Sequence, residues 1–306
     1  METTSDRQQS WLRGACPTST LMTRNTRDRV PRCVRGRVSH MAFDFKGEHI
    51  EVAHGTGEDR GVLTVTINRP PVNALSRAVQ EELRRVAVAV NSDDDVRVVV
   101  ITGGAKVFAA GADVKEMSQW SADQAREETG GLQSAFTAIA EIRVPVIAQM
   151  SGYALGGGLE LALCADIRVA DSTIKLGQPE ILLALIPGAG GTQRLTRLIG
   201  PSRAKELIFT GRQVRADEAL AMGLVNDVVE PDVLPTRVAE LARTLARASQ
   251  PALRAAKRAI TAADAALAAG LSEERVEFTA LFGQLDANRG FASFLADGPG
   301  KADFRD

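Results

Sequence analysis

Apolar and polar residues alternate along residues 61–70 (GVLTVTINRP), and this pattern predicts a half-buried strand that ends at Pro70. Residues 76–94 repeat apolar residues at helical spacing instead, which predicts an amphipathic helix. Its apolar face would hold Val79, Leu83, Val86 and Val90. The unbroken apolar run within residues 96–104 predicts a buried strand, so the chain begins with alternating strands and helices, which is typical of an α/β fold.

The pattern continues through short strands and then becomes helical. Further strands are expected at residues 143–152, 166–171 and 174–180. Six helices are expected after them, the first three each closed by a glycine in the C-cap role: 190–200, 202–211, 215–223, 233–248, 252–269 and 271–287. We expect this helical part to pack on the core or on another subunit.

The overall composition is that of a globular protein. The chain has 306 residues, 44% of them hydrophobic and 25% charged, with a net charge of −1. No apolar run approaches the roughly 18–20 residues of a transmembrane helix, and the near-neutral balance gives no reason to expect a membrane or nucleic acid as partner. The three cysteines show neither metal-ligand spacing nor a disulfide framework, so we expect a reducing compartment, the cytoplasm.

The first 40 residues differ from the rest in charge. They hold eight arginines and no lysine against three acids, which leaves a local charge of +5. A mitochondrial transit peptide and a nucleic-acid-binding arm are two interpretations, but the acids and the missing amphipathic stripe weaken the first. We expect a disordered extension, or sequence upstream of a natural start at Met41.

Several common catalytic patterns are missing from the sequence. There is neither a Gly-x-Ser-x-Gly nucleophile elbow nor a phosphate-binding Gly-x4-Gly-Lys-[Ser/Thr] loop. Residues 188–193 (GAGGTQ) lack the third glycine of a dinucleotide-binding fingerprint. The three histidines, His40, His49 and His54, all precede the motif-rich region, so neither a histidine triad nor a metal site is expected. The chemistry must come from carboxylates and backbone groups.

Three glycines, residues 156–158, stand at the start of a predicted helix that runs through Leu161 and Leu163. Each costs the helix about 1 kcal/mol relative to alanine. The first N–H groups of a helix have no partner within it, and glycines leave them open to a ligand, so this turn can stabilise an oxyanion. Glu160 lies in the same turn, either as an ordinary helix-start carboxylate or as a desolvated acid suited to proton transfer.

Two further stretches have a similar character. In residues 107–117 (VFAAGADVKEM), small residues after a buried strand allow close approach to the backbone, although an ordinary strand-to-helix turn is the plainer interpretation. In residues 176–195 (LGQPEILLALIPGAGGTQRL), Glu180 precedes an apolar run and a glycine-rich turn. Considered alone, Glu180 is more simply interpreted as a structural residue than as a catalytic one. Two glutamates in apolar surroundings beside glycine-rich donors, however, can divide acid and base roles.

Together these stretches resemble the crotonase (enoyl-CoA hydratase/isomerase) superfamily in their order and spacing. The matching pieces are INRPPVNALS, FAAGADVKEM, SGYALGGGLELALCADIRVA, LGQPEILLALIPGAGGTQRL, AKELIFTGR and ADEALAMGLVNDVV, so the resemblance covers about residues 44–300. It implies an α/β fold, a crotonase-type spiral of ββα units with a helical C-terminal oligomerisation region. The expected parts are a spiral core with the CoA and catalytic site at 41–243 and a helical region at 244–306, assembled as a homotrimer or homohexamer.

The resemblance also implies roles for individual residues. The N–H groups of Ala112 and Gly157 would hold the thioester oxygen of an acyl-CoA substrate. Glu160 would deprotonate a water that the Gly188 N–H helps to position, and Glu180 would deliver a proton to C2. Contacts to CoA are expected from Ala110, Ala112, Asp113, Val114, Lys115, Gly157 and Lys301. No separate cofactor and no metal is implied, because CoA is part of the substrate.

The presence of both glutamates favours a hydratase that converts a 2-trans-enoyl-CoA into a 3-hydroxyacyl-CoA. The alternatives are an enoyl-CoA isomerase, another crotonase-family reaction such as 3-methylglutaconyl-CoA hydration, or a non-catalytic scaffold. One branch of the family binds RNA through a Lys-rich helix, but the corresponding helix at 76–94 mixes glutamate and arginine and has no lysine. Nucleic acid is therefore not expected as a partner. Binding through the Arg-rich extension is the one remaining way in which the chain would bind nucleic acid.

Overall fold

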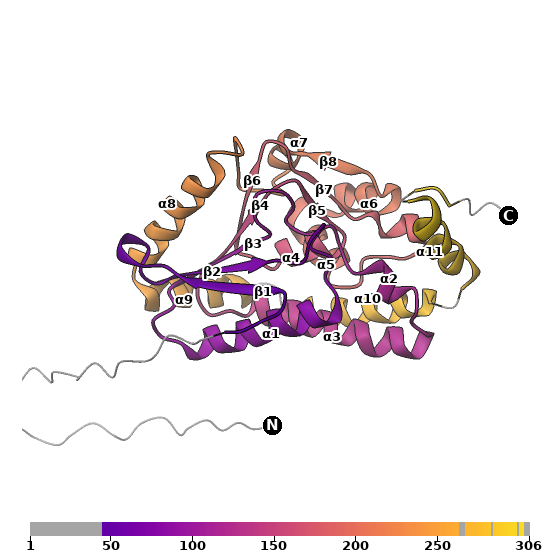
Figure 1. The fold of residues 1–306 in the computed structure, drawn as a ribbon, viewed down its shortest axis with the longest axis horizontal. Coiled ribbons are helices and arrows are strands. Elements are labelled where there is room, and N and C mark those ends of the chain that lie inside the picture. Colours follow the sequence, from indigo (N-terminus) through magenta and orange to yellow (C-terminus); the bar gives the residue numbers. More distant parts are fainter. Residues whose placement is uncertain (1–44, 263–266, 283, 299, 303–306) are drawn as a thin grey trace, which may run out of the picture. The chain divides into compact units, whose positions relative to one another are not determined.

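The computed structural model describes residues 45–262, 267–282, 284–298 and 300–302 (Figure 1). The Arg-rich extension, expected to be disordered at residues 1–40, lies outside the described residues. The chain from residue 45 onward forms two sheets, one of six strands and one of three. Within the described ranges, none of the helices combines the length and the apolar character needed to span a bilayer.

The larger sheet has the strand order β1-β2-β3-β4-β6-β9. Strand β1 is antiparallel to β2, and the other neighbours are parallel. The strands are β1 (Ile50–His54), β2 (Val62–Ile67), β3 (Val98–Thr102), β4 (Val146–Met150), β6 (Ile167–Asp171) and β9 (Asp227–Val229). The strands predicted within 61–70, 96–104, 143–152 and 166–171 are confirmed, whereas β1 and β9 have no counterpart among the predictions.

The smaller sheet contains the strands that directly follow β4 and β6 along the chain. It contains β5 (Tyr153–Leu155), β7 (Lys175–Gly177) and β8 (Gln213–Arg215). Strand β4 leads into β5 and the short helix α4 (Gly157–Ala162), and β6 leads into β7 and the 3-10 helix η2 (Pro179–Leu183). A bridge between Ala109 and Ala154 places the segment after β3 beside β5 in the same way. The expected ββα units are therefore present.

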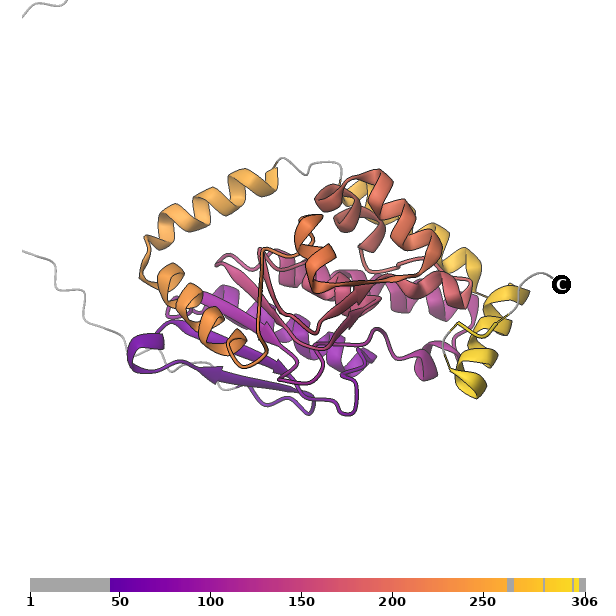
Figure 2. The ribbon, with the colours of Figure 1, turned by 90° about the horizontal axis from the view of Figure 1, so that it is seen from above.

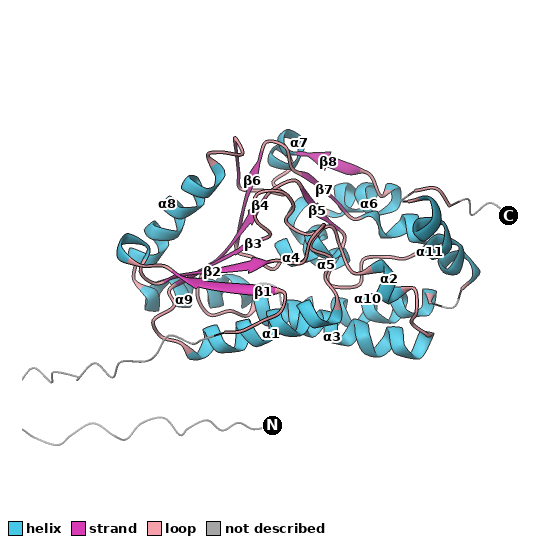
Figure 3. Ribbon diagram, in the orientation of Figure 1, coloured by secondary structure: helices cyan, strands magenta, loops and turns pink. Residues whose placement is uncertain are grey.

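Helices cover both faces of the larger sheet (Figures 1 and 3). Helices α1 (Arg77–Ser92) and α3 (Ala122–Ala140) pack against each other on one face, and α8 (Leu234–Arg247) packs on the other. The predicted apolar face of α1 is fully buried. All five residues of β3 are buried, because alternate side chains join the core on either side of the sheet. This two-sided burial explains the unbroken apolar run of the strand.

The last part of the chain is helical, as predicted. Its helices are α5 (Gly191–Ile199), α6 (Pro201–Thr210), α7 (Ala216–Ala221), α9 (Gln250–Thr261), α10 (Leu267–Leu281) and α11 (Leu285–Asp297). The helices predicted over 252–269 and 271–287 are wrong in their bounds, because α9 ends at Thr261, α10 runs from Leu267 to Leu281, and a separate helix, α11, follows. Figure 2 shows α9 at the periphery, and Gln250 alone among its side chains is buried.

Candidate active site

The glycine triplet opens α4, and each glycine is required by a different neighbour. Gly156 has φ +50° and ψ −125°, which side chains rarely allow, and a Cβ there would lie 2.9 Å from Glu180 Oε1. A Cβ on Gly157 would lie 3.2 Å from the Ala112 nitrogen. A Cβ on Gly158 would overlap the carbonyl of Ala109. The triplet thus keeps α4 tight against the segment around Ala112 and leaves space in front of Glu180.

Two backbone N–H groups are left open at this contact. Among the described residues, neither the Ala112 N–H nor the Gly157 N–H donates to a backbone or side-chain acceptor. Gly157 is the first residue of α4, where N–H groups lack a partner within the helix. Both residues line the same pocket. Two such donors can stabilise a carbonyl oxygen on which negative charge develops.

Glu160 extends from the first turn of α4 toward the second glycine-rich turn. Its Oε1 accepts hydrogen bonds from the N–H groups of Ala189 (2.8 Å) and Gly191 (2.7 Å). Its side chain is buried, and this burial, together with the neighbouring carboxyls of Glu180 and Glu274, raises its pKa well above the ordinary value. The two N–H donors act in the opposite direction. Oε2 has no hydrogen-bond partner among the described residues and is the oxygen available for proton exchange.

Glu180 reaches the same pocket from η2. Burial raises its pKa to about 8, and the charge of Glu274 adds to this effect. A hydrogen bond from the backbone N–H of Glu180 itself lowers the pKa of this carboxyl group, but burial outweighs it. With its amide nitrogen facing Glu180, the buried Gln178 donates to both carboxyl oxygens, at 2.9 and 3.1 Å. Glu160 and Glu180 therefore differ in their donors, since the N–H groups of Ala189 and Gly191 bind Glu160 and the Gln178 amide binds Glu180.

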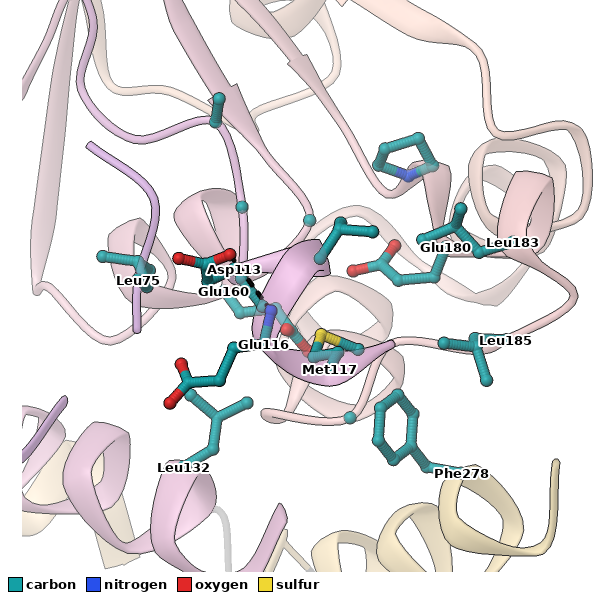
Figure 4. Close-up of a pocket in the computed structure, with 18 of the residues that line it drawn as sticks. Leu75, Asp113, Glu116, Met117, Leu132, Glu160, Glu180, Leu183, Leu185 and Phe278 are labelled. Carbon is teal, nitrogen blue, oxygen red and sulfur yellow. Dashed lines mark hydrogen bonds between the residues drawn. The ribbon is translucent and has the colours of Figure 1, made fainter. Parts of the chain in front are cut away.

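The pocket that the two glutamates share is apolar (Figure 4). Its hydrophobic lining includes Leu75, Met117, Trp120, Leu132, Leu183, Leu185 and Phe278. Phe278, on α10, also lies against the predicted water-positioning residue, because a Cβ on Gly188 would come within 2.8 Å of its ring. Such a lining excludes water and strengthens the electrostatic interactions inside the pocket.

The residues expected to contact CoA fall into two groups. Five of them line the pocket: Ala110, Ala112, Asp113, Val114 and Gly157. Lys115 and Lys301 are exposed and lie outside this lining.

The carboxylate of Asp113 is occupied within the protein. It caps the short helix α2 (Val114–Met117), where Oδ1 accepts from the N–H groups of Lys115 (3.1 Å) and Glu116 (3.3 Å). Oδ2 forms an ion pair with Arg69 at 2.6 Å. This side chain therefore fixes α2 at the pocket wall.

Three residues near the site were not predicted: Gln178, Glu274 and Phe278. Gln178 is a polar residue one position before Pro179 and could have been noticed within that motif. Glu274 and Phe278 lie on α10 in the sequence SEERVEF, which looks like an ordinary solvated helix. Only the packing of α10 against α3 and α5 brings them to the site.

Comparisons with known proteins agree with the motifs. A family model described as Enoyl-CoA hydratase/isomerase matches residues 57–305. A "Probable enoyl-CoA hydratase echA8" from Mycobacterium tuberculosis is 43% identical over 239 residues, which cover 78% of this chain and 92% of the relative. The "Crotonyl-CoA hydratase" of Syntrophomonas wolfei is 43% identical over 232 residues, 75% of this chain and 89% of the relative. A crystal structure of an enoyl-CoA hydratase from Bacillus anthracis matches with a TM-score of 0.68 and 39% identity, covering 81% of this chain and 96% of that one. The chain therefore belongs to the enoyl-CoA hydratase/isomerase family, the crotonase superfamily.

Proposed function

We propose that the protein is an enoyl-CoA hydratase, which adds water across the double bond of a 2-trans-enoyl-CoA to give a 3-hydroxyacyl-CoA in acyl-CoA breakdown. The observation that carries this proposal is that Glu160 and Glu180 line one apolar pocket together with two open backbone N–H groups. Hydration of a conjugated thioester needs both parts, donors for the enolate oxygen and a pair of groups for two proton transfers. Relatives named as hydratases support the same activity.

The proposed reaction follows from this arrangement. The thioester oxygen binds between the N–H groups of Ala112 and Gly157, which polarises the conjugated double bond and makes C3 electrophilic. The water oxygen bonds to C3 while Oε2 of Glu160 takes a proton from the water, and the electron pair moves to the thioester oxygen. Glu180, whose pKa of about 8 keeps it protonated at neutral pH, gives its proton to C2. Glu160 acts as its anion, which the N–H groups of Ala189 and Gly191 favour against the burial that raises its pKa. Glu160 gains one proton from the water and Glu180 gives one proton to C2, so the net change to the substrate is the addition of one water.

The remaining parts of the proposal concern positioning. The Gly188 N–H holds the attacking water, since Gly188 lines the pocket next to Ala189, which donates to Glu160. CoA extends from the pocket along Ala110 and residues 113–115. Lys301 is exposed near the C-terminus and is proposed to meet the CoA phosphates.

We also propose a homotrimer or homohexamer in the cytoplasm. Large apolar side chains on the C-terminal helices are exposed, including Ile260, Val276 and Leu285. Their exposure supports an interface with other copies of the chain. Light scattering coupled to size-exclusion chromatography measures the number of subunits, and a monomer at micromolar concentration would contradict this part.

The activity is tested by following the loss of the enoyl absorbance of crotonyl-CoA with the wild type and two variants, Glu160→Gln and Glu180→Gln. Glutamine keeps the side-chain volume but cannot exchange the proton, so each variant should lose about 10²–10⁴-fold in kcat. Circular dichroism confirms that the variants are folded. A folded wild type that leaves crotonyl-CoA unchanged but converts a 3-enoyl-CoA into its 2-enoyl isomer would make the protein an isomerase.

A further inference from the structure

Two carboxylates, Glu160 and Glu274, share the backbone of one glycine-rich turn. Four successive N–H groups of this turn are divided between them alternately. Glu160, on α4, accepts those of Ala189 and Gly191, and Glu274, on α10, accepts those of Gly190 (2.5 Å) and Thr192 (2.9 Å). The conformation that lets Glu160 receive its two donors is thus the one that Glu274 holds from the other side.

Glu274 accepts more hydrogen bonds than Glu160 does. Its Oε2 also accepts from the Thr192 hydroxyl at 2.5 Å, and its Oε1 accepts from the Gln133 amide on α3 at 3.3 Å. Both oxygens therefore face donors, and the side chain is only 3% exposed. Glu274 is not among the residues that line the pocket, so it can influence a substrate only through the turn and through its charge.

We propose that Glu274 is a positioning residue for the hydration reaction, holding the turn at 189–192 in the conformation in which two backbone N–H groups orient Glu160. This inference rests on the function proposed above. It predicts that the placement of Oε2 of Glu160, the oxygen without a hydrogen-bond partner among the described residues, depends on a side chain that never touches the substrate.

The charge of Glu274 gives this role a measurable signature. The charged and titratable groups around Glu160 are Glu180, Glu274, Cys164 and Arg194, and Asp113 and Glu116 line the same pocket. Burial and the two neighbouring glutamates raise the pKa of Glu160. Burial raises the pKa of Glu274 as well, while its hydrogen bonds from Thr192, Gly190 and Gln133 lower it. At pH values where Glu274 is ionised, removing its charge should lower the pKa of Glu160 and move the acidic limb of the kcat/KM profile to lower pH.

The test compares Glu274→Gln with Glu277→Gln, which removes the same charge from an exposed position of the same helix. Glutamine fits the space, but its amide nitrogen cannot accept a hydrogen bond from the Thr192 N–H. The side chain therefore keeps only one of its two hydrogen bonds from the backbone of the turn. We expect kcat for crotonyl-CoA to fall about 10–100-fold in E274Q, with a smaller change in KM, since a small misplacement of a catalytic group has this effect. The acidic limb should move to lower pH. E277Q should behave as the wild type does.

A second variant separates geometry from charge. Thr192→Val removes the hydroxyl that donates to Glu274 but keeps the carboxylate, so kcat should fall while the acidic limb does not move to lower pH. An E274Q enzyme with the wild-type kcat and the wild-type limb would overturn the inference, whatever its Tm, because a purely structural residue changes only Tm.

A third measurement is independent of turnover. Infrared difference spectroscopy without substrate follows the protonated carboxyl band of Glu160, assigned with E160Q, in the wild type, E274Q and E277Q. A lower pKa of Glu160 in E274Q alone supports the coupling even if the wild type fails to hydrate crotonyl-CoA, which would count against the proposed function only. An unchanged titration of Glu160 in an E274Q enzyme that also keeps the wild-type kcat would overturn the inference and leave the function standing.

Discussion

Gly157 and Ala112 approach each other so closely that a methyl group on Gly157 would lie 3.2 Å from the Ala112 nitrogen. The N–H groups of both residues lack a partner among the described residues, and both residues line the pocket. The missing side chain at Gly157 thus keeps the path to both donors clear.

Gly157→Ala should reduce kcat for crotonyl-CoA about 10²-fold while the protein remains folded, because the new methyl group crowds one oxyanion donor. The matched control is Gly131→Ala in α3, where a Cβ would meet nothing within 4 Å. That variant should keep its activity and gain about 0.5–1 kcal/mol of stability. Steady-state kinetics and thermal unfolding of both variants check this, and a fully active Gly157→Ala enzyme would argue against the assigned donors.

The rate should depend on pH through Glu180. Its pKa of about 8 means that the proton needed at C2 is lost as the pH rises through this value. We therefore expect kcat/KM to fall on the alkaline side with a midpoint near pH 8, tenfold for each further unit. Kinetics across the pH range, with circular dichroism at each pH, measure this limb. A flat profile one unit above the midpoint would show that Glu180 is not the acid.

Stability should also depend on pH, with a definite sign. Because the pKa of Glu180 is higher in the folded state, about 8, than its ordinary value of 4.5, the folded state binds this proton more tightly. The corresponding stability is complete below pH 4.5 and is lost as the pH rises through 8. Urea unfolding should show a smaller fall in the free energy of unfolding over this range for Glu180→Gln than for the wild type. Identical slopes would contradict the raised pKa.

Asp113 should matter through the helix that it caps. Asp113→Ala removes both the cap of α2 and the ion pair with Arg69, so we expect a loss of about 1 kcal/mol and a higher KM, because α2 forms part of the pocket wall. Asp123→Ala is the control, since the Asp123–Arg126 pair is exposed and contributes little. Equal stability and KM in the two variants would mean that the cap does not hold α2.

Glu82 should affect stability without touching the chemistry. This buried residue of α1 accepts the backbone N–H groups of Glu48, His49 and Ile50 and so ties the start of β1 to the helix. Glu82→Gln leaves a buried donor unpaired and should lower the free energy of unfolding by about 1–3 kcal/mol, with kcat unchanged. The exposed neighbour Glu81 provides the control variant, Glu81→Gln, which should change stability by less than about 0.5 kcal/mol.

The parts of the fold that the sequence predicts best are those in which local spacing and burial agree. Helix α1 and strand β3 belong to this class, since the period of their apolar residues directly reflects the faces that they bury. The glycine triplet and the two glutamates stand out because their local composition conflicts with ordinary helix stability and ordinary solvation, but it is the family resemblance that predicts their place at the site.

The contributions of the C-terminal helices could not be predicted. Glu274 stands among other charged residues, and nothing in its neighbours distinguishes it from a solvated side chain. Its burial results from the packing of α10 on α3 and α5, a contact between segments far apart in the chain. The strands β1 and β9 were missed for a related reason, because their burial pattern is irregular and their pairing depends on neighbours from elsewhere.

The position of α10 has a consequence for the order in which the enzyme is made. A ribosome releases the glycine triplet, Glu160 and Glu180 before it synthesises Glu274 and Phe278. Until α10 docks, the turn at 189–192 lacks half of its acceptors and the pocket lacks one wall. A nascent chain that already contains Glu160 and Glu180 is therefore expected to gain its full activity only when the last eighth of the protein, from α10 onward, has folded onto the rest.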